Sequence, residues 1–234
     1  MITLSNLTLA YQQKCLLRSA NVTFGSGTLT ALVGRNGAGK STLLRAIAAI
    51  DNPAEGSVLL KGENLHKLNA EQRAKLISFV STQRVRIANM LCQDVVAIGR
   101  APYTNWLGSM QPQDKLLVSN ALEAVGMSSF AHRAIDTLSD GECQRIMIAR
   151  ALAQQTPVIV LDEPTAFLDI PTRFEICRLL SDLAKSSGKT IIFSTHDIDA
   201  AMPVCDTFAI LENATLTLHS GAEAQEQIKT LFSL

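Results

Sequence analysis

The stretch GRNGAGKS at residues 34–41 constrains the interpretation of the rest of the chain. It matches the pattern GxxxxGK[ST], in which glycines let successive backbone N–H groups curve around phosphate oxygens. The apolar residues TALV (30–33) precede it and TLLRAIAAI (42–50) follows it. This is the strand–loop–helix context that the motif requires, and the helix N-terminus adds the positive end of its dipole. The stretch therefore predicts a phosphate-binding loop between a buried strand and a helix.

This loop assigns roles to individual side chains. Lys40 is expected to reach the β- and γ-phosphates of a nucleotide, and Ser41 to place its hydroxyl on Mg²⁺. A glycine-rich turn that happens to carry a lysine is the alternative, and the flanking elements argue against it. The nucleotide-binding residues expected from this region are Gly34, Asn36, Gly37, Ala38, Gly39, Lys40, Ser41 and Thr42.

A second motif, VIVLDEP at residues 158–164, is an apolar run that ends in two acids. A strand buried on both faces carries its functional groups at its carboxyl end, beside the phosphate-binding loop. Asp162 is therefore expected to hold Mg²⁺, directly or through water. Glu163 is expected to orient or deprotonate the attacking water. The alternative for both acids is a solvated strand end.

Composition and charge exclude several classes of protein. The chain has 234 residues, with 21 Lys+Arg and 21 Asp+Glu, so its net charge of zero argues against a nucleic-acid partner. A hydrophobic fraction of 47% argues against a disordered chain. No apolar run approaches the ~18 residues of a membrane span, and the N-terminus has the pattern of a strand instead of a signal peptide. The five cysteines form no CxxC pair, which favours reduced thiols.

Strands and helices alternate along most of the chain. Fully apolar strands in such an order are typical of a mostly parallel sheet covered on both faces. Residues 84 to about 137 differ, because apolar residues there repeat at helical spacing between prolines and a glycine. The expected strands are 2–9, 16–24, 28–33, 57–62, 77–82, 158–161, 190–194 and 207–211, and the expected helices are 43–50, 70–76, 142–154, 172–186 and 198–202.

Between the two motifs, residues 138–142 (LSDGE) resemble the LSGGQ signature of ABC ATPases. The resemblance covers nearly the whole chain. It implies an α/β fold: a P-loop NTPase (RecA-like) core with a mostly parallel sheet, an N-terminal antiparallel β-subdomain and a helical insert. It further implies one ABC ATPase domain over 1–234, with the core at 1–83 and 138–234 and the helical subdomain at about 84–137.

The same resemblance implies roles for other residues. Tyr11 matches the aromatic residue that stacks on adenine, and Gln83 matches the glutamine that joins the core to the helical insert and binds Mg²⁺. His196 matches the histidine that contacts the γ-phosphate, and AFLD at 166–169 resembles the loop after the catalytic glutamate. The alternatives are structural: a strand-end aromatic, a strand-end polar residue and a buried imidazole. Phe167 and Trp106 are expected to be packing or interface residues.

The signature departs from the family pattern at two positions, Asp140 in place of Gly and Glu142 in place of Gln. Ser139 and Glu142 also form an S-x-x-E capping box, so a helix is expected to start there and present Ser139 Oγ and N–H groups to an anion. In the family that anion is the γ-phosphate of ATP bound to the other subunit, which Ser139, Asp140, Gly141 and Glu142 would contact. Either Asp140 points away, or its charge weakens this contact.

The family resemblance implies a cycle and a set of partners. Two copies meet head to tail as a homodimer on binding ATP, and hydrolysis by Glu163 lets the pair open. The segment VVAIGRAPYTNWLG (95–108) resembles bacterial importers of iron–siderophore complexes, haem and vitamin B12. This implies two integral membrane permease subunits, an outer substrate-binding protein, and a peripheral location on the cytoplasmic face of the bacterial inner membrane.

In that importer group, a helix of the membrane subunit docks near the helical insert. Arg84, Arg86 and Arg100 are candidates for this contact, or ordinary solvated charges. Two other classes remain open. One is a non-transport ABC ATPase of the iron–sulphur assembly or DNA-handling type, which would lack the WLG segment. The other is the ATPase subunit of an exporter, whose membrane segments are often fused to it.

Overall fold

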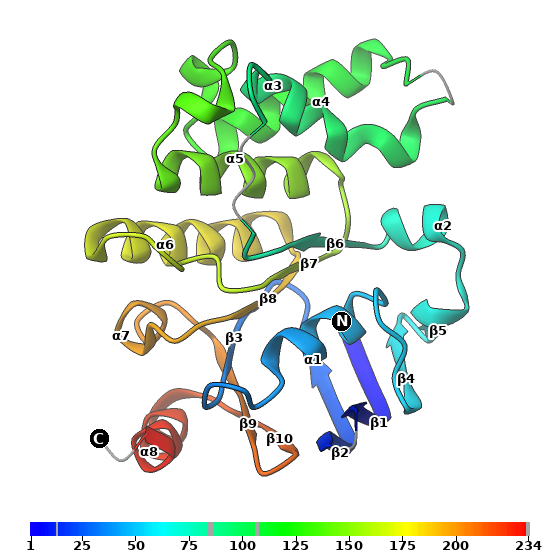
Figure 1. Cartoon of the computed structure of the whole chain (residues 1–234), viewed down its shortest axis with the longest axis vertical. Coiled ribbons are helices and arrows are strands. Elements are labelled where there is room, and N and C mark those ends of the chain that lie inside the picture. Colours follow the sequence, from blue (N-terminus) through cyan, green and yellow to red (C-terminus); the bar gives the residue numbers. More distant parts are fainter. Residues whose placement is uncertain (13, 84–86, 106–107, 233–234) are drawn as a thin grey trace.

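A six-stranded sheet forms the centre of the computed structural model, which describes residues 1–12, 14–83, 87–105 and 108–232 (Figure 1). The strand order is β10-β9-β3-β8-β7-β6. The five strands from β9 to β6 are parallel, and β10 is antiparallel to β9. The strands are β3 (Leu29–Val33), β6 (Ile77–Val80), β7 (Val158–Leu161), β8 (Thr190–Ser194), β9 (Thr207–Glu212) and β10 (Thr215–His219).

A second, antiparallel sheet is built from the N-terminal part of the chain, in the order β2-β1-β4-β5. In β1, apolar and polar residues alternate, and Ile2 and Leu4 are buried while their neighbours face outward. This period of two is what a sheet with one buried face requires. The strands are β1 (Ile2–Tyr11), β2 (Lys14–Phe24), β4 (Glu55–Leu60) and β5 (Glu63–Asn64).

The central sheet separates two hydrophobic cores. In β8, Ile191 and Phe193 pack into one core and Ile192 into the other, and all three are fully buried. One core lies between the central sheet, α1 and the antiparallel sheet; the other includes α3 to α6 and α8. Burial on both faces explains why β3, β7 and β8 consist mostly of apolar residues and do not alternate between apolar and polar ones.

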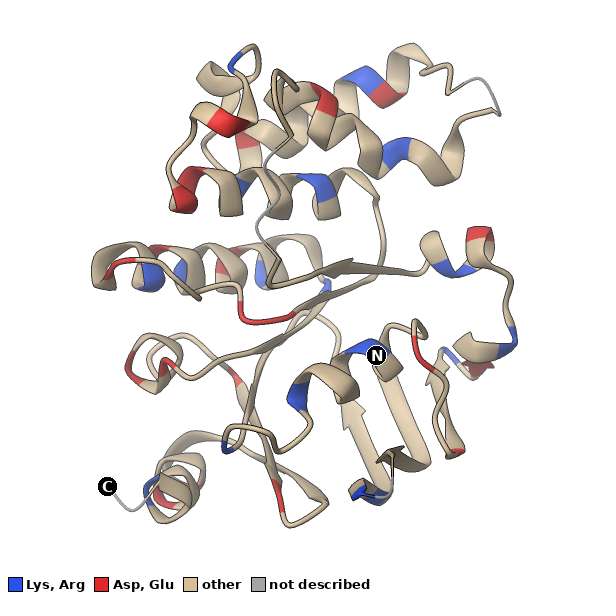
Figure 2. Ribbon diagram, viewed as in Figure 1, with Lys and Arg blue, Asp and Glu red and all other residues tan. Residues whose placement is uncertain are grey.

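Helices cover the sheet and form one end of the molecule, where α3 and α4 pack on α5 (Figure 1). Acidic and basic residues are interspersed both over this helical end and over the part of the molecule that contains the sheets (Figure 2). Among the described residues, no helix is long and apolar enough to span a membrane. The helices are α1 (Lys40–Ile47), α2 (Ala70–Ala74), α3 (Cys92–Ala97), α4 (Pro112–Ala124), α5 (Asp140–Ala153), α6 (Ile170–Ser187), α7 (Ile198–Ala201) and α8 (Gly221–Phe232), with 3₁₀ turns η1 (Leu65–Lys67), η2 (Ile98–Tyr103), η3 (Ser128–Phe130) and η4 (Ile135–Thr137).

The predicted fold class is confirmed: the core is α/β with a mostly parallel sheet, an antiparallel N-terminal sheet and helices between β6 and β7. Some element bounds differ from the prediction. Helix α6 begins at Ile170 instead of Thr172, because the Asp169 side chain accepts a hydrogen bond from Thr172 N and caps the helix. Strand β10 and helix α8, beyond Leu211, were not predicted.

Both alternatives for Arg100, contact with a membrane subunit or an ordinary solvated charge, are wrong, because its side chain is part of the interior. Arg100 is only 5% exposed. Its Nε donates to Asp114 Oδ1 (2.9 Å), its Nη1 donates to the carbonyl of Ala153 (2.7 Å), and its guanidinium stacks on the Tyr103 ring. Arg100 thus joins η2 to α4 and to the end of α5. Arg84, Arg86 and Trp106 lie outside the described residues.

Arg100→Ala is expected to lower the free energy of unfolding by about 3–5 kcal/mol, because it leaves the buried carboxylate of Asp114 without its cationic partner. Arg45→Ala, which breaks the exposed Arg45–Asp51 pair, is the control and should cost less than about 1 kcal/mol. Urea denaturation of both variants measures the difference. Equal losses would contradict a structural role for Arg100.

Candidate functional site

The phosphate-binding loop, residues 34–41, runs from β3 into the first turn of α1. Its backbone adopts conformations that require glycine. Gly37 and Gly39 have positive φ angles of 74° and 106°, which side chains other than glycine rarely adopt. A Cβ on Gly34 would lie 2.6 Å from the carbonyl oxygen of Leu211. The carbonyl of Arg35 accepts a hydrogen bond from Ala38 N (3.1 Å), and Lys40 Nζ donates to the carbonyl of Gly34 (3.0 Å). The loop is therefore fixed by its own bonds and by β9.

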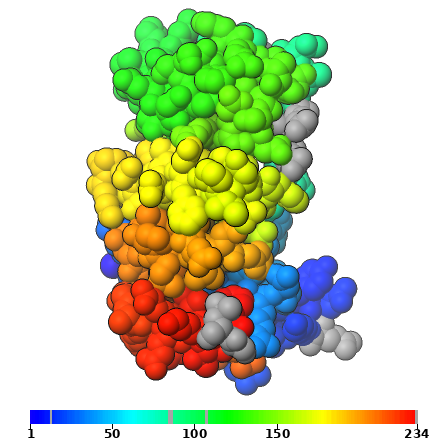
Figure 3. All heavy atoms as spheres, turned by 90° about the vertical axis from the view of Figure 1, so that its left-hand side faces the viewer, coloured from blue at the N-terminus to red at the C-terminus, as the bar shows by residue number. Residues whose placement is uncertain are grey.

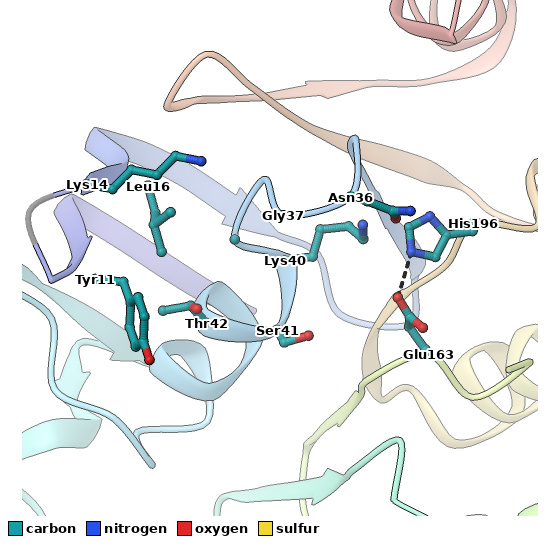
Figure 4. A pocket seen from close by; sticks show the side chains of 11 residues that line it. Tyr11, Lys14, Leu16, Asn36, Gly37, Lys40, Ser41, Thr42, Glu163 and His196 are labelled. Atoms are coloured by element: carbon teal, nitrogen blue, oxygen red, sulfur yellow. Dashed lines mark ion pairs between the residues drawn. The ribbon is translucent and has the colours of Figure 1, made fainter.

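A cavity of about 360 Å³ opens over this loop (Figure 4). Tyr11 stands at one end of it, Lys40 lies in the middle, and Glu163 and His196 face each other at the opposite end. The Tyr11 side chain is 63% exposed, so its ring is available for stacking. The lining residues are Tyr11, Lys14, Leu16, Asn36, Gly37, Gly39, Lys40, Ser41, Thr42, Glu163 and His196.

Asp162 joins the loop to the ends of two strands. Its Oδ1 accepts hydrogen bonds from Ser41 Oγ (3.0 Å) and from Ser194 Oγ (2.7 Å). The Thr82 hydroxyl, beyond β6, donates to the carbonyl of Asp162 (2.9 Å). Asp162 is buried, and a buried carboxylate needs such donors. The first turn of α1 and the carboxyl ends of β6, β7 and β8 therefore meet at this residue.

Glu163 and His196 are paired, with Glu163 Oε1 lying 2.7 Å from His196 Nε2. Glu163 has a positive φ of 48°, an uncommon conformation for a residue with a side chain. Its N–H donates to Ser194 Oγ (2.8 Å), which holds the backbone in this state. The turn after β7 thus aims the carboxylate of Glu163 at the loop that carries His196.

Asp197, next to His196, connects its own loop to the segment after Glu163 and to α6. Its Oδ2 accepts a hydrogen bond from Thr165 Oγ1 (2.6 Å), and its Oδ1 accepts one from Arg173 Nη1. Arg173 Nε donates to the carbonyl of Leu168 (2.8 Å). The segments that follow Glu163 and that carry His196 are therefore held together by Arg173 and Asp197.

The charge of Lys40 depends on its surroundings. Burial lowers the pKa of Lys40, and the nearby carboxylates of Glu163 and Asp162 act in the opposite direction. Phosphate oxygens in the cavity would add negative charge beside Nζ and favour the protonated form. Lys40 can therefore serve as a phosphate-binding cation.

Residues 139–142 form the N-cap and first turn of α5, and they do not line this cavity. The Ser139 hydroxyl and N–H both donate to Glu142 Oε2 (2.8 Å each), and Glu142 N donates to Ser139 Oγ (3.3 Å). The backbone N–H and hydroxyl of Ser139 lower the pKa of Glu142. This is the predicted capping box. Gly141 leaves room for α6, because a Cβ there would lie 2.7 Å from Thr172 Cγ2.

Residues 17–166 match the family described as ABC transporter. The chain belongs to this family. An ABC transporter ATP-binding protein of Methanocaldococcus jannaschii is 39% identical and aligns over 100% of this chain and 82% of its own length. The achromobactin transport ATP-binding protein of Dickeya dadantii is 36% identical over 100% and 88%, and the iron(3+)-hydroxamate import ATP-binding protein of Bacillus subtilis is 33% identical over 92% and 80%.

Solved structures of ABC proteins have the same fold. One is the inward-facing structure of a transporter described as metal-chelate type. It superposes with a TM-score of 0.85 at 27% identity, covering 100% of this chain and 89% of the other chain. An ATP-binding cassette solved as a dimer with ADP and Pi has a TM-score of 0.79 at 28% identity, over 94% and 98%. The chain is an ABC-type ATPase, and ABC ATPases act as dimers.

In this ABC cassette, most of the predicted nucleotide-binding residues lie around one cavity, together with Glu163 and His196. Gly34 and Ala38 do not line it, although both belong to the loop. Gln83 lines a smaller neighbouring cavity of about 30 Å³ with Asp140 and Glu163. None of residues 139–142 lines the larger cavity, and of these four only Asp140 lines the smaller one.

Sequence reasoning missed three residues of the site. Lys14 and Leu16 line the cavity between Tyr11 and the loop. They lie three and five residues after Tyr11, on the strand β2 that follows β1, and no sequence motif marks them. Ser194 bridges Asp162 and the Glu163 backbone. Ser194 could have been predicted as a site residue, because it is a polar residue at the carboxyl end of the apolar run TIIF.

Arg173→Ala is expected to lower kcat for ATP hydrolysis by about 10- to 100-fold, because the segments carrying Glu163 and His196 lose their common anchor. The KM for ATP should change much less, since the phosphate-binding loop is untouched. Phosphate release over a range of ATP concentrations measures both. Arg178→Ala, an exposed position on the same helix, is the control. An equal fall in both variants would contradict a positioning role for Arg173.

Proposed function

We propose that this ABC cassette energises the import of an iron–siderophore, haem or cobalamin-type substrate across the bacterial inner membrane. It would act peripherally on the cytoplasmic face, as a homodimer beneath two integral membrane permease subunits, with a substrate-binding protein outside. The arrangement of Lys40, Glu163 and His196 around one cavity supports the ATPase part. The names of the relatives, which specify achromobactin transport and iron(3+)-hydroxamate import, support the substrate class.

Nucleotide binding follows from the lining of the cavity. The Tyr11 ring would stack on adenine, a contact worth about 1–3 kcal/mol in nucleic-acid complexes. The backbone N–H groups of residues 36–41 and the N-terminus of α1 would bind the phosphates. Lys40 would exchange its bond to the Gly34 carbonyl for the β- and γ-phosphates. Lys14 would add a second cation above the loop.

The oxygen atoms beside Lys40 fit Mg²⁺. Ser41 Oγ and Asp162 Oδ1 lie 3.0 Å apart, and oxygen is the donor type that Mg²⁺ prefers. Ser41 and Asp162 would hold the ion, with Gln83 reaching it from the adjacent cavity. Bound there, Mg²⁺ would neutralise charge on the phosphate oxygens.

Glu163 is the proposed general base. Its carboxylate would accept a proton from the water that attacks the γ-phosphorus, and loss of such a base typically costs about 10²- to 10⁴-fold in rate. His196, 2.7 Å from Glu163, would contact the γ-phosphate and keep the carboxylate in place. The strained Glu163 backbone fixes this geometry before nucleotide binds.

The signature would complete the site of the other copy. The N-terminus of α5 presents N–H groups, but the Ser139 hydroxyl donates to Glu142 within the chain. For Ser139 to donate to a γ-phosphate, that bond has to be exchanged. The carboxylate of Asp140 adds a negative charge at the same helix end. We infer that the two acids weaken ATP-dependent closure relative to the LSGGQ pattern.

Glu163→Gln is expected to bind ATP, to lose hydrolysis by at least about 10²-fold, and to accumulate as a dimer. Nucleotide binding, phosphate release and light scattering measure the three effects. Adding Asp140→Gly to this variant should strengthen dimerisation, because it removes a negative charge that, in the proposed dimer, would lie near the γ-phosphate of the other copy. A double variant that dimerises more weakly than Glu163→Gln alone would contradict the inference about Asp140.

The transport assignment is tested by purification of the full-length chain from membranes in a mild detergent. A multi-span integral membrane protein is expected to co-elute, and ATPase activity should rise when the binding protein and its metal chelate are added. Lys40→Ala is the control, since it should still co-elute but should not hydrolyse ATP. If only soluble proteins co-elute while ATPase activity is intact, the chain is an ATPase of a non-transport class.

A further inference from the structure

The phosphate-binding loop is joined to the last turn of the C-terminal helix by one side chain. Arg35 Nε and Nη2 both donate to the carbonyl oxygen of Leu231, at 3.3 and 3.1 Å. The two residues are 196 positions apart in the sequence. Figure 3 shows the red surface of α8 next to light-blue atoms of the region around the loop. None of the nucleotide-binding roles given above uses Arg35.

At Leu231 the guanidinium meets a group that needs a partner. The last four carbonyl groups of an α-helix have no N–H partner within the helix, and they carry the negative end of its dipole. A cation with two donors is well suited to this position. In the same turn, the side chains of Ile228 and Leu231 are buried in the hydrophobic core. Arg35 therefore completes the attachment of the end of α8.

On the other side, Arg35 is part of the loop that would surround the phosphates. Its carbonyl accepts the Ala38 N–H bond that closes the turn, and its neighbour Asn36 lines the nucleotide cavity. A change in the loop on nucleotide binding would thus act on Arg35 directly. The end of α8 also borders the loop that carries His196, across a groove of about 650 Å³ lined by Phe232, His196 and Ile198.

We propose that Arg35 is a positioning residue that couples the phosphate-binding loop to the C-terminal helix, so that nucleotide binding stabilises the last turn of α8 and an attached α8 strengthens nucleotide binding. The two effects are one coupling free energy and are therefore reciprocal. The inference rests on nucleotide binding at the phosphate-binding loop. It makes α8 a site from which a partner could change ATP affinity without touching ATP.

Hydrogen exchange of the full chain, with and without Mg²⁺ and a non-hydrolysable ATP analogue, tests this coupling. In the unmodified protein, nucleotide should slow exchange both at residues 34–41 and in the last turn of α8. In Arg35→Ala, residues 34–41 should still respond and the α8 response should disappear, while the Kd for nucleotide rises by about fivefold, the lower end of measured couplings. Arg35→Lys should restore part of both effects.

Lys229→Ala is the matched control, because it removes an exposed cation from the same helical turn without touching the loop; its nucleotide response should equal that of the unmodified protein. An α8 response that persists in Arg35→Ala would overturn the proposal. So would an unmodified protein whose loop responds to nucleotide while α8 does not. Absence of any response at residues 34–41 would instead overturn nucleotide binding itself, and the coupling with it. If Arg35→Ala does not fold, Arg35→Lys and the unmodified protein decide the question by the same readout.

Discussion

The buried carboxylate of Asp162 is the constraint on which the rest of the site depends. A carboxylate removed from water is unfavourable unless donors surround it, so its position at the end of β7 requires Ser41 and Ser194 to be within reach. Those two hydroxyl groups come from α1 and β8. Satisfying one acid therefore places the first turn of α1, the end of β7 and the end of β8 in a fixed relation.

The position of the proposed base follows from that relation. Because Ser194 donates to Asp162, its oxygen remains available to accept the N–H of Glu163, and this holds the strained turn that aims the Glu163 carboxylate. His196 follows two residues after Ser194 on the same chain segment and reaches Glu163. The proposed base and its histidine partner are thus positioned by hydrogen bonds around Asp162, whose own proposed role is to hold Mg²⁺.

Much of this could be predicted from the sequence because the relevant signals are local or periodic. The apolar runs before Gly34 and Asp162 predict buried parallel strands, and parallel strands present their carboxyl ends at one edge of a sheet. The capping box at Ser139 was likewise predictable from the sequence, because it depends only on two residues three positions apart. The confirmed fold class rests on such features, and the LSDGE segment gave the family.

The rest depends on contacts between residues distant in sequence. Arg100 looks like a surface charge beside Tyr103, and only the approach of Asp114 and the end of α5 makes it internal. Lys14, the first residue of β2, lines the cavity, but no sequence motif marks this position. Helix α8 was not predicted because only three of its residues, Ala224, Ile228 and Leu231, are buried, and its contacts with β9 and Arg35 are distant in sequence.

The packing also limits how the helical end can move relative to the sheet. Val95 of α3, Leu122 of α4 and Leu180 of α6 belong to one continuous hydrophobic core that extends to the central sheet. Separating these layers would expose side chains that each contribute about 1.5–3 kcal/mol by burial. A motion driven by nucleotide is therefore expected to be a small rotation in which this core stays packed, the usual behaviour of interfaces between close-packed elements. The N-terminus of α5 is suited to transmit it, because Ser139 lies at the surface while Ile146 and Ile148 of the same helix lie in that core.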